Sequence, residues 1–421
     1  MEGVDFFTQY FAYAKELNGS SEAPDIFHRW SAIVGLGAWL GNSFQLQHGR
    51  SLLNPNIYAM LIGEAGSRKS SSIKLLVGLM ATAGYKYFGA KKTSREKYFM
   101  DLAEGMDNEH TVEDMMEKNL FGAANEHDAS ESFIAADEFN RFFQTNILEF
   151  VSDLGDLWDF TGSYPYRLKN SKSLIIHNPV ISILGGNTQT ALNAAFPSEI
   201  IGQGFFSRIL MIYGEKTGHR ITFPRAVSKE ETTEMLELLQ AIKLKCTGIV
   251  KVTPGAEKLL DKIYKNWKGI DDVRFDSYSN RRFTHLLKLT IIVAASRLQE
   301  SITEHTVVAA NTVLSYAEHF MPKALGEFGK AKHSDVAQKV IQIIEGTHLP
   351  LQPSAIFKQL SNDLDKPSDL APILQNLVAA EKIKKTDIGF LLVRKQLEDR
   401  KDIVDFSILT KQEREKVGSD D

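Results

Sequence analysis

Residues 63–70 combine two glycines with a terminal lysine–serine pair, a pattern that can bind phosphate. The segment reads Gly63-Glu64-Ala65-Gly66-Ser67-Arg68-Lys69-Ser70 and follows an apolar run over 57–62. A glycine-containing loop between a strand and a helix directs backbone N–H groups and the positive end of the helix dipole toward an anion. We therefore expect Lys69 to contact the β- and γ-phosphates of ATP and Ser70 to hold Mg²⁺, with the segment from Gly63 to Ser71 binding the nucleotide.

Arg68 departs from this pattern, because glycine is usual immediately before the lysine. Two interpretations remain open: the arginine tolerates the backbone geometry of the loop, or it weakens nucleotide binding. A chance match is the competing explanation of the whole motif. The strand pattern before it and the helical pattern over 71–80 supply the context that a phosphate loop requires.

Two acidic residues end a second apolar run. Residues 133–138 read Phe-Ile-Ala-Ala-Asp-Glu. We expect Asp137 to hold Mg²⁺, directly or through water, and Glu138 to polarise the attacking water. Alone, such a pair at a strand end is usually a solvated turn, but together with the phosphate loop it predicts a hydrolytic site.

Two further apolar strands carry a polar residue at one end. Residues 179–187 end in Asn187, which we expect to position the lytic water and sense the γ-phosphate; in isolation it would be taken as a turn asparagine. Arg208 begins the apolar run 209–212. An arginine delivered to a neighbouring subunit from such a position stabilises transition-state charge, an effect of about 10³ to 10⁵ in rate in other systems. A salt-bridged surface arginine is the alternative.

Apolar periodicity divides the chain into five parts and predicts an α/β fold with a mostly parallel sheet. The pattern predicts a short helical region over 1–53, which includes a helix over 27–40, and the α/β core over 54–224. Long helices are expected over 225–328, followed over 334–395 by three helices and a β-hairpin in the order of a winged helix. Residues 396–421 are expected to form a largely disordered tail.

Composition narrows the function classes. A hydrophobic fraction of 43% and a charged fraction of 24% are ordinary for a soluble globular protein. The single cysteine, Cys246, excludes a disulfide framework and a cysteine-based zinc site and fits a reducing compartment. The most apolar stretch, 290–295, is too short to span a bilayer, so no membrane role is expected. With a net charge of −4, nucleic-acid binding would need a local basic strip.

The order of these motifs resembles that of AAA+ ATPases. The closest likeness is to the minichromosome maintenance (MCM) helicases and to MCM-like ATPases of phages, prophages and mobile elements. It covers about residues 25–325 and is most specific at 204–212 and 280–289. The resemblance implies an AAA+ P-loop core with a helical lid and a C-terminal winged helix. It also implies assembly into a ring of six subunits in the cytoplasm of a bacterial host. Residues 1–53 are too short for the oligonucleotide-binding tier of MCM rings.

The same resemblance assigns roles to basic residues. Arg208 looks like the arginine finger, Arg281 or Arg282 like the second sensor arginine, and Lys288 falls where the MCM helix has a second basic residue. Arg208 and the Arg281/Arg282 pair would complete the site of the next subunit.

Residues 164–176 predict a β-hairpin with basic residues near its tip. In MCM-like rings a hairpin at this point projects into the channel and tracks the phosphate backbone, so the resemblance implies DNA contact through Lys169 and Lys172, with Arg167 as a weaker candidate. Contacts of this kind are salt-sensitive and independent of sequence. A solvated basic turn is the alternative.

Together these features predict an ATP-driven, ring-forming translocase or helicase for replication of a phage or mobile element. Its partners would be copies of itself, single-stranded or forked DNA, and other replication proteins. One alternative is a helicase loader or initiator that uses ATP as an assembly switch. Another is remodelling of protein substrates, for which Lys169 and Lys172 would be dispensable. The winged helix would contact either DNA or protein.

Overall fold

The computed structural model describes residues 5–16, 21–104, 129–143, 147–167, 174–196, 200, 204–224, 227–326, 335–347, 349–361, 363–364, 366–379, 382–392 and 402–417. The chain forms two compact units. The first comprises Met1–Gly326 with Arg400–Asp421, and the second comprises Glu327–Asp399.

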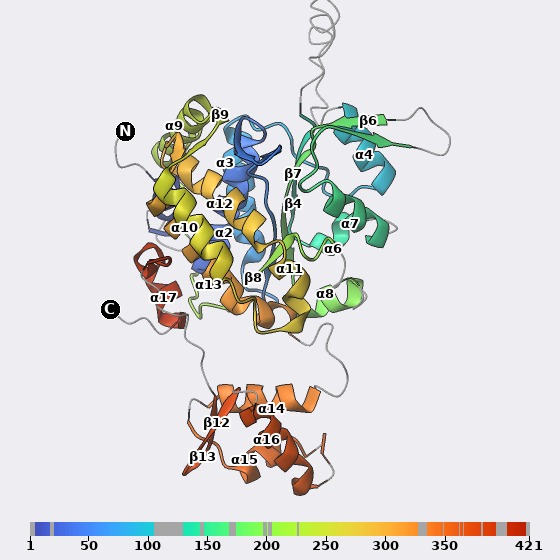
Figure 1. The fold of residues 1–421 in the computed structure, drawn as a ribbon, viewed down its shortest axis with the longest axis vertical. Coiled ribbons are helices and arrows are strands. Elements are labelled where there is room, and N and C mark those ends of the chain that lie inside the picture. The colour runs from blue at the N-terminus through green and yellow to red at the C-terminus, as the bar shows by residue number, and fades with distance from the viewer. Residues whose placement is uncertain are drawn as a thin grey trace, which may run out of the picture. The chain divides into compact units, whose positions relative to one another are not determined.

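A four-stranded parallel sheet lies at the centre of the first unit (Figure 1). Its spatial order is β4 (Glu131–Ala136), β7 (Val180–Asn187), β3 (Tyr58–Ile62) and β8 (Ile209–Tyr213). Every residue of β3 and β7 is buried, which explains why these strands are continuous apolar runs rather than alternating ones. Ile62 pairs with Asn187 on one side and Tyr213 on the other, so three carboxyl ends meet at one edge. The predicted α/β organisation with a parallel sheet is confirmed.

Helix α2 (Asp25–Leu40) is buried along its whole length. It packs against α3 (Lys69–Thr82), the central strands and α12 (Arg282–Ser296). Gly35 and Gly37 permit this approach, because a Cβ at Gly37 would collide with the carbonyl oxygen of Pro55 and one at Gly35 with the side chain of Leu76. A helix that is buried all round belongs to the core, so α2 is part of the sheet domain.

The N-terminal region is only partly helical. It contains α1 (Phe6–Phe11), a π-helical turn η1 (Ala12–Glu16) and α2, but then a hairpin of β1 (Phe44–His48) and β2 (Ser51–Leu53). Strand β1 also pairs in parallel with β9 (Gly248–Ile249). The expectation of a helical region through residue 53 was wrong here, because Phe44 to Gln47 alternate apolar and polar side chains with the period of a strand.

The region predicted as a lid contains long helices but does not form a separate unit. Helix α13 (Glu304–Leu325) packs on β8, and α12 packs on α2 and α13. The other elements of the first unit are α4 (Arg95–Glu104), α6 (Phe139–Phe142), α7 (Ile147–Asp156), β5 (Ser163–Tyr166), β6 (Leu174–His177), α8 (Gln189–Ala195), α9 (Lys229–Lys245), β10 (Lys251–Val252), α10 (Pro254–Asn266), η3 (Val273–Phe275), α11 (Asp276–Ser279) and β11 (Ser301–Ile302).

The second unit has the predicted order of three helices followed by a β-hairpin. Its elements are α14 (Asp335–Glu345), α15 (Pro353–Gln359), η5 (Pro367–Asp369), α16 (Leu370–Ala379), β12 (Ile383–Thr386) and β13 (Gly389–Leu392). The two strands are antiparallel, with Ile383 opposite Leu392. Val340, Ile344, Ile356 and Leu374 contribute to its own buried core.

Residues 402–417, the described part of the C-terminal segment, belong to the first unit. They form η6 (Phe406–Ile408) and α17 (Lys411–Val417). Glu413 accepts hydrogen bonds from Nε and Nη2 of Arg29 in α2, at 2.9 and 2.6 Å. For residues 402–417 the expectation of a disordered tail was wrong, because it was based on the charged composition and overlooked the apolar side chains and the ion pair that dock this segment. The other residues of 396–421 lie outside the described residues. The buried apolar residues are Ile403, Val404, Leu409 and Val417.

None of the described helices is long and apolar enough to cross a membrane. The most apolar stretch, 290–295, lies within α12, where it is buried in the core.

Candidate active site

The loop between β3 and α3, which the sequence predicts to bind phosphate, turns sharply. Gly66 and Arg68 both adopt the left-handed conformation, with φ of 78° and 64°. Gly63 has no space for a side chain, because a Cβ there would lie 2.5 Å from the carbonyl oxygen of Gly214 and 2.8 Å from Oγ of Ser67. The loop therefore turns tightly against the strand ends before α3 begins.

The ammonium group of Lys69 lies across this loop. Its Nζ donates to the carbonyl oxygens of Gly63 and Glu64 at 2.8 and 2.9 Å and to Oγ of Ser67 at 3.1 Å. Burial lowers the pKa of Lys69, and the nearby charge of Lys216 lowers it further. All three acceptors are neutral, so the positive charge of Lys69 is held in place by dipoles and stays available to an anion.

The N-terminus of α3 adds to this attraction. The 14-residue helix begins at Lys69 without a side-chain cap and without an acidic residue in its first turn. Ser70 is half-buried and Ser71 is exposed in that turn. Uncapped N–H groups and the helix dipole favour an anion at such an end.

Asp137 and Glu138 follow β4 and lie beside the end of β7. A Cβ on Gly186 of β7 would lie 2.5 Å from the carbonyl oxygen of Asp137. Each acid has a cationic partner: Nζ of Lys74 is 3.1 Å from Oδ2 of Asp137, and Nε of Arg141 is 2.5 Å from Oε2 of Glu138. Both pairs are solvent-exposed and therefore weak. Incoming ligands can displace them.

Sequence reasoning missed these two cations. The signal that could have identified Arg141 is its spacing of three residues from Glu138 at the start of a short helix. Lys74 lies on α3 and reaches Asp137, the residue that follows β4. That contact is set by packing of α3 on β4 and has no signal in the local sequence.

Asn187 ends β7 next to the phosphate loop. Its backbone oxygen accepts from the N–H of Gly63 at 3.4 Å. Its Nδ2 donates to Oδ1 of Asn140 at 2.7 Å, and its Oδ1 accepts from the N–H of Thr188 at 3.1 Å. Asn140, which the sequence analysis also missed, donates in turn to the carbonyl oxygen of Ala191 at 2.6 Å. The amide of Asn187 is therefore fixed in orientation by α6 and α8.

The strand order brings these groups together. Because β7 lies between β3 and β4, Asn187 lies between the end of the strand that leads to Lys69 and the end of the strand that leads to Asp137. Lys69, Ser70, Asp137, Glu138 and Asn187 thus converge at the carboxyl edge of the sheet. Open α/β sheets bind their ligands in the crevice outside this edge.

Arg208 lies at the opposite edge. It precedes β8, and Ile209 pairs with Tyr58 at the start of β3, so the length of β3 separates Arg208 from the phosphate loop of its own chain. At a rise of roughly 3.3 Å per residue this is a separation of about 15 Å. Its Nη1 donates to the carbonyl oxygen of Gly204 at 2.8 Å, and its Nη2 lies 3.8 Å from Oδ1 of Asp159. Burial lowers the pKa of Arg208, and the charge of Arg281 lowers it further.

The structure separates the roles of Arg281 and Arg282. Arg281 is partly exposed and its Nη1 donates to Oδ2 of Asp159 at 2.9 Å, so it lies beside Arg208. Arg282 is buried: its Nε donates to Oε1 of Glu318 at 2.8 Å, and its guanidinium lies 4.0 Å from the ring centroid of Trp267. The side chain of Arg282 therefore stabilises the packing of α12 on α13. Of the two arginines, only Arg281 is exposed enough to contact a ligand.

The predicted hairpin is present as β5 and β6, which pair in antiparallel fashion with Ser163 opposite His177. It precedes β7, so it lies at the end of that strand remote from α8 (Figure 1). Arg167, just after β5, is exposed. Lys169 and Lys172 lie outside the described residues.

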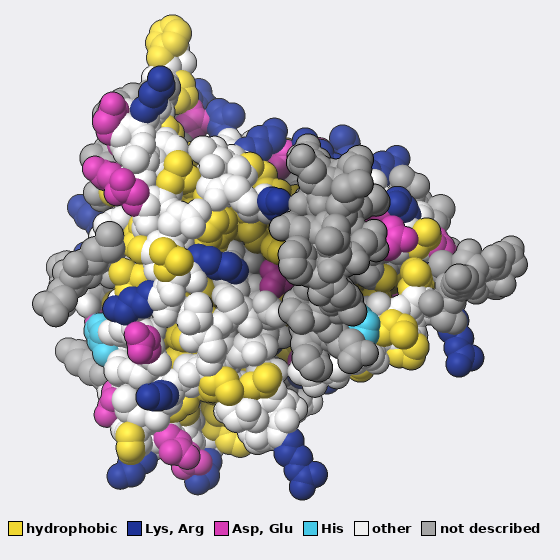
Figure 2. Space-filling model, turned by 90° about the horizontal axis from the view of Figure 1, so that it is seen from above, with side chains coloured by type: hydrophobic (Ala, Val, Ile, Leu, Met, Phe, Trp, Pro, Cys, Tyr) yellow, Lys and Arg dark blue, Asp and Glu magenta, His cyan; other side chains and the backbone are white. Residues whose placement is uncertain are grey.

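Charge on the face shown in Figure 2 is mixed. Lys and Arg side chains lie mostly near the margin in this view, interspersed with acidic and apolar ones. The described surface of this face thus offers scattered basic groups rather than one continuous basic strip, in keeping with the net charge of −4.

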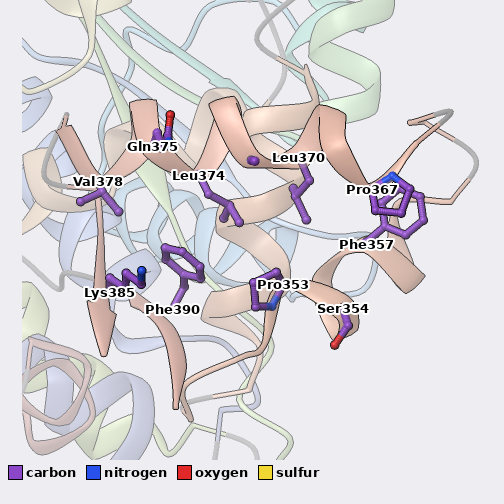
Figure 3. A pocket seen from close by; sticks show the side chains of 11 residues that line it. Pro353, Ser354, Phe357, Pro367, Leu370, Leu374, Gln375, Val378, Lys385 and Phe390 are labelled. Atoms are coloured by element: carbon purple, nitrogen blue, oxygen red, sulfur yellow. The ribbon is translucent and has the colours of Figure 1, made fainter. Parts of the chain in front are cut away.

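The second unit contains an apolar pocket of about 660 Å³ between α15, α16 and the β12–β13 hairpin. Leu370, Leu374, Val378 and Phe390 line it, with Lys385 on the strand beside it (Figure 3). Helix α16 carries no charged residue. Since DNA affinity depends mainly on basic side chains, this face is better suited to a protein than to DNA.

No protein-family model and no curated protein sequence matches this chain. The described residues contain no group of three or more His, Cys, Asp or Glu side chains that could hold a metal ion by themselves. Mg²⁺ in nucleotide sites needs only one or two protein ligands, since phosphate oxygens and water complete its shell. Ser70, in the first turn of α3, and Asp137, just after β4, both lie at the carboxyl edge of the sheet and fit that requirement.

Proposed function

We propose that this chain is an AAA+-type ATPase that hydrolyses ATP at sites shared between neighbouring copies of a ring. One observation carries the proposal: Lys69, Asp137 and Asn187 converge at the carboxyl edge of the sheet, while Arg208 and Arg281 form a second cationic group remote from it. A single copy has both halves of a phosphoryl-transfer site but cannot bring them together.

ATP binding would use the phosphate loop. Lys69 would exchange the neutral oxygens of Gly63, Glu64 and Ser67 for phosphate oxygens, and the N–H groups at the start of α3 would donate to the same anion. Ser70 and Asp137 would hold Mg²⁺, which neutralises phosphate charge when bound. The ion pair between Lys74 and Asp137 would then break. This costs little free energy, because the pair is exposed to solvent.

Hydrolysis would use Glu138 and Asn187. Glu138 would accept a proton from, or polarise, the attacking water after its exposed pair with Arg141 opens. Asn187 is already fixed by Asn140 and Thr188, so it can orient that water without further ordering. Arg208 and Arg281 of the neighbouring copy would stabilise the charge that develops on the transferred phosphoryl group.

We propose that ATP hydrolysis at this site drives movement of the protein along DNA. The β5–β6 hairpin, with exposed Arg167 after its first strand, supports this proposal. The alternative is a helicase loader or initiator, which the apolar pocket and uncharged α16 of the second unit support because they suit a protein partner. Strand displacement stimulated by single-stranded DNA favours the first; nucleotide-dependent binding to a separate helicase favours the second.

The direct test is Glu138→Gln. We expect ATP affinity to stay within about threefold of wild type and turnover to fall by about 10² to 10⁴, the usual contribution of a general base. Equilibrium binding of a fluorescent ATP analogue and phosphate release measure the two quantities.

Glu149→Gln is the matched control, since Glu149 is an exposed acid paired with Arg95 at 3.0 Å on another part of the same domain. Its turnover should equal that of wild type. Hydrolysis that survives Glu138→Gln would show that the strand ending in Asp137 and Glu138 does not form the hydrolytic site.

A further inference from the structure

Asp159 lies between the two arginines at the remote edge of the sheet. Its Oδ2 accepts from Nη1 of Arg281 at 2.9 Å, and its Oδ1 lies 3.8 Å from Nη2 of Arg208. One carboxylate thus serves two guanidinium groups that come from different parts of the chain, one before β8 and one at the start of α12. The arginines repel each other, and Asp159 is the carboxylate that pairs with both.

The backbone beside Asp159 is anchored on the core. The carbonyl oxygen of Trp158 accepts from Nδ2 of Asn56 at 3.0 Å and from Nζ of Lys288 at 3.3 Å. Asn56 lies just before β3 and also donates to Ile181 of β7 at 2.9 Å. Trp158 itself is buried, so the position of the Asp159 carboxylate is fixed relative to the sheet and to α12.

Arg208 has a hydrogen-bond donor that its contact with Asp159 does not use. Its side chain is mostly buried, and within the described residues its Nε has no hydrogen-bond partner. Buried donors without a partner are rare and costly. Because this Nε is buried, an anion from outside the chain could satisfy it only if the side chain turns, and until then Asp159 keeps the guanidinium at this edge of the sheet.

We propose that Asp159 is the positioning residue that holds Arg208 and Arg281 at a common spacing, so that one copy presents both to the phosphates bound by its neighbour. This inference rests on the proposed function. Without the carboxylate, repulsion would separate the two guanidinium groups, and the geometry that transition-state stabilisation requires would be lost.

The first test compares Asp159→Asn, Asp159→Glu and Asp156→Asn in ATP turnover. Asp156 is an exposed acid three positions earlier. Its negative charge also acts on Arg208, but it forms no ion pair with either arginine in the described structure. We expect Asp159→Asn to lower kcat by about tenfold or more with KM for ATP within about threefold, because the residues that bind ATP in the same chain are untouched. Asp159→Glu should recover part of the loss. Asp156→Asn, which removes a nearby charge but no ion pair, should lower kcat much less than Asp159→Asn.

Mixing experiments locate the defect in one half of the site. A copy with Asp159→Asn keeps its phosphate loop, and a copy with Lys69→Ala keeps its arginines. Mixtures should regain activity at some interfaces, as mixtures of Arg208→Ala with Lys69→Ala should. An Asp159→Asn variant as active as wild type, or more active, would overturn the inference; a gain would mean that Asp159 restrains the arginines.

A chemical measurement separates this inference from the proposed function. Phenylglyoxal modifies unpaired arginines, and mass spectrometry of the peptides reports the rate at each one. Modification of Arg281 should be faster in Asp159→Asn than in wild type and unchanged in Asp156→Asn. Equal rates in all three proteins would overturn the pairing, whereas a wild-type protein that turns over no ATP but shows this pattern would contradict the proposed function alone.

Discussion

Arg68 occupies a backbone position where glycine is usual. Its left-handed conformation costs a side-chain-bearing residue about 1–2 kcal/mol. The guanidinium pairs with Glu22, whose carboxylate also accepts from the N–H of Ile221 at 2.7 Å and whose carbonyl oxygen accepts from Oγ1 of Thr217 at 2.9 Å. The side chain is thus directed to the segment before α2 and away from the loop interior. Of the two interpretations left open by the sequence, this geometry favours tolerance.

Arg68→Gly should therefore change the Kd for ATP by less than about threefold, because the loop already has the shape that glycine would adopt. Lys69→Ala should weaken binding by about tenfold or more, since it removes a charged partner of the phosphates. Isothermal titration of both variants measures the difference. If Arg68→Gly bound ATP more than about tenfold more tightly than wild type, the arginine would be shown to weaken nucleotide binding.

Lys288 connects helix α12, which begins just after Arg281, to the segments before β3 and after α7. Its Nζ donates to the carbonyl oxygens of Asn54 and Trp158 at 3.0 and 3.3 Å, and also to Oδ1 of Asn56. Burial lowers the pKa of Lys288 to about 7. An unfolded chain would keep this lysine protonated up to its ordinary value of 10.5. Between these values the unfolded state binds more protons, so raising the pH stabilises the folded state.

Lys288→Met should reduce this pH dependence. For wild type, Lys288 adds up to about 1.4 kcal/mol per pH unit to the rise in the free energy of unfolding above pH 7. Urea unfolding between about pH 7.5 and 9.5 avoids the titration of tyrosines in the unfolded chain. Lys258→Met, at an exposed position of α10, should keep the wild-type slope. An unchanged slope in Lys288→Met would show that this lysine is not buried as described.

Helix α17 is held by a buried ion pair rather than by a large apolar face. Arg29 and Glu413 have side chains that are 7% and 2% exposed, and Arg29 also donates to the carbonyl oxygen of Ile408 at 3.1 Å. The preceding residue, Gln412, accepts from the N–H of Asp25 at 2.8 Å. Helix α17 therefore packs against the N-terminal part of α2.

Glu413→Gln should lower the free energy of unfolding of the first unit by about 3–5 kcal/mol, because it removes the carboxylate that pairs with the buried Arg29. Lys416→Gln is the control, since its contact with Glu215 is exposed and such pairs contribute at most about 1 kcal/mol. Chemical denaturation measures both. A loss for Glu413→Gln no larger than that of the control would show that α17 is not docked on α2 in solution.

On the scale of the whole molecule, the two halves of the candidate site lie at opposite edges of one sheet. Completion of the site would therefore require another copy, and a repeated head-to-tail contact closes into a ring when its rotation allows. The second unit is folded on its own core and can differ in role from the sheet domain.

Glu138→Gln, which should retain ATP, is the variant for measuring assembly. Native mass spectrometry should show it as a closed oligomer with ATP, most simply six copies, and as smaller species without nucleotide. Arg208→Ala should assemble less completely, because the phosphates lose a partner across the interface. Identical masses with and without ATP and single-stranded DNA would contradict a nucleotide-linked ring.

Much of the fold and of the candidate site could be predicted from local sequence. Signals within a few residues of each other predicted the turn between β3 and α3, the strands that end near Asp137 and at Asn187, and the three helices and hairpin of the second unit. Periodicity shows which face of an element is buried, and a glycine at a turn shows that the backbone there can adopt a left-handed conformation.

Only the tertiary structure decided which element each buried face meets. It placed β7 between β3 and β4, assigned Arg282 to Glu318 while leaving Arg281 beside Asp159, and docked α17 on α2 through Glu413. It also paired β1 with β9, about two hundred residues away in the chain. The physical reason is that apolar burial has no direction: periodicity specifies that a face must be covered, and the partner is selected by the packing of all the other elements at once.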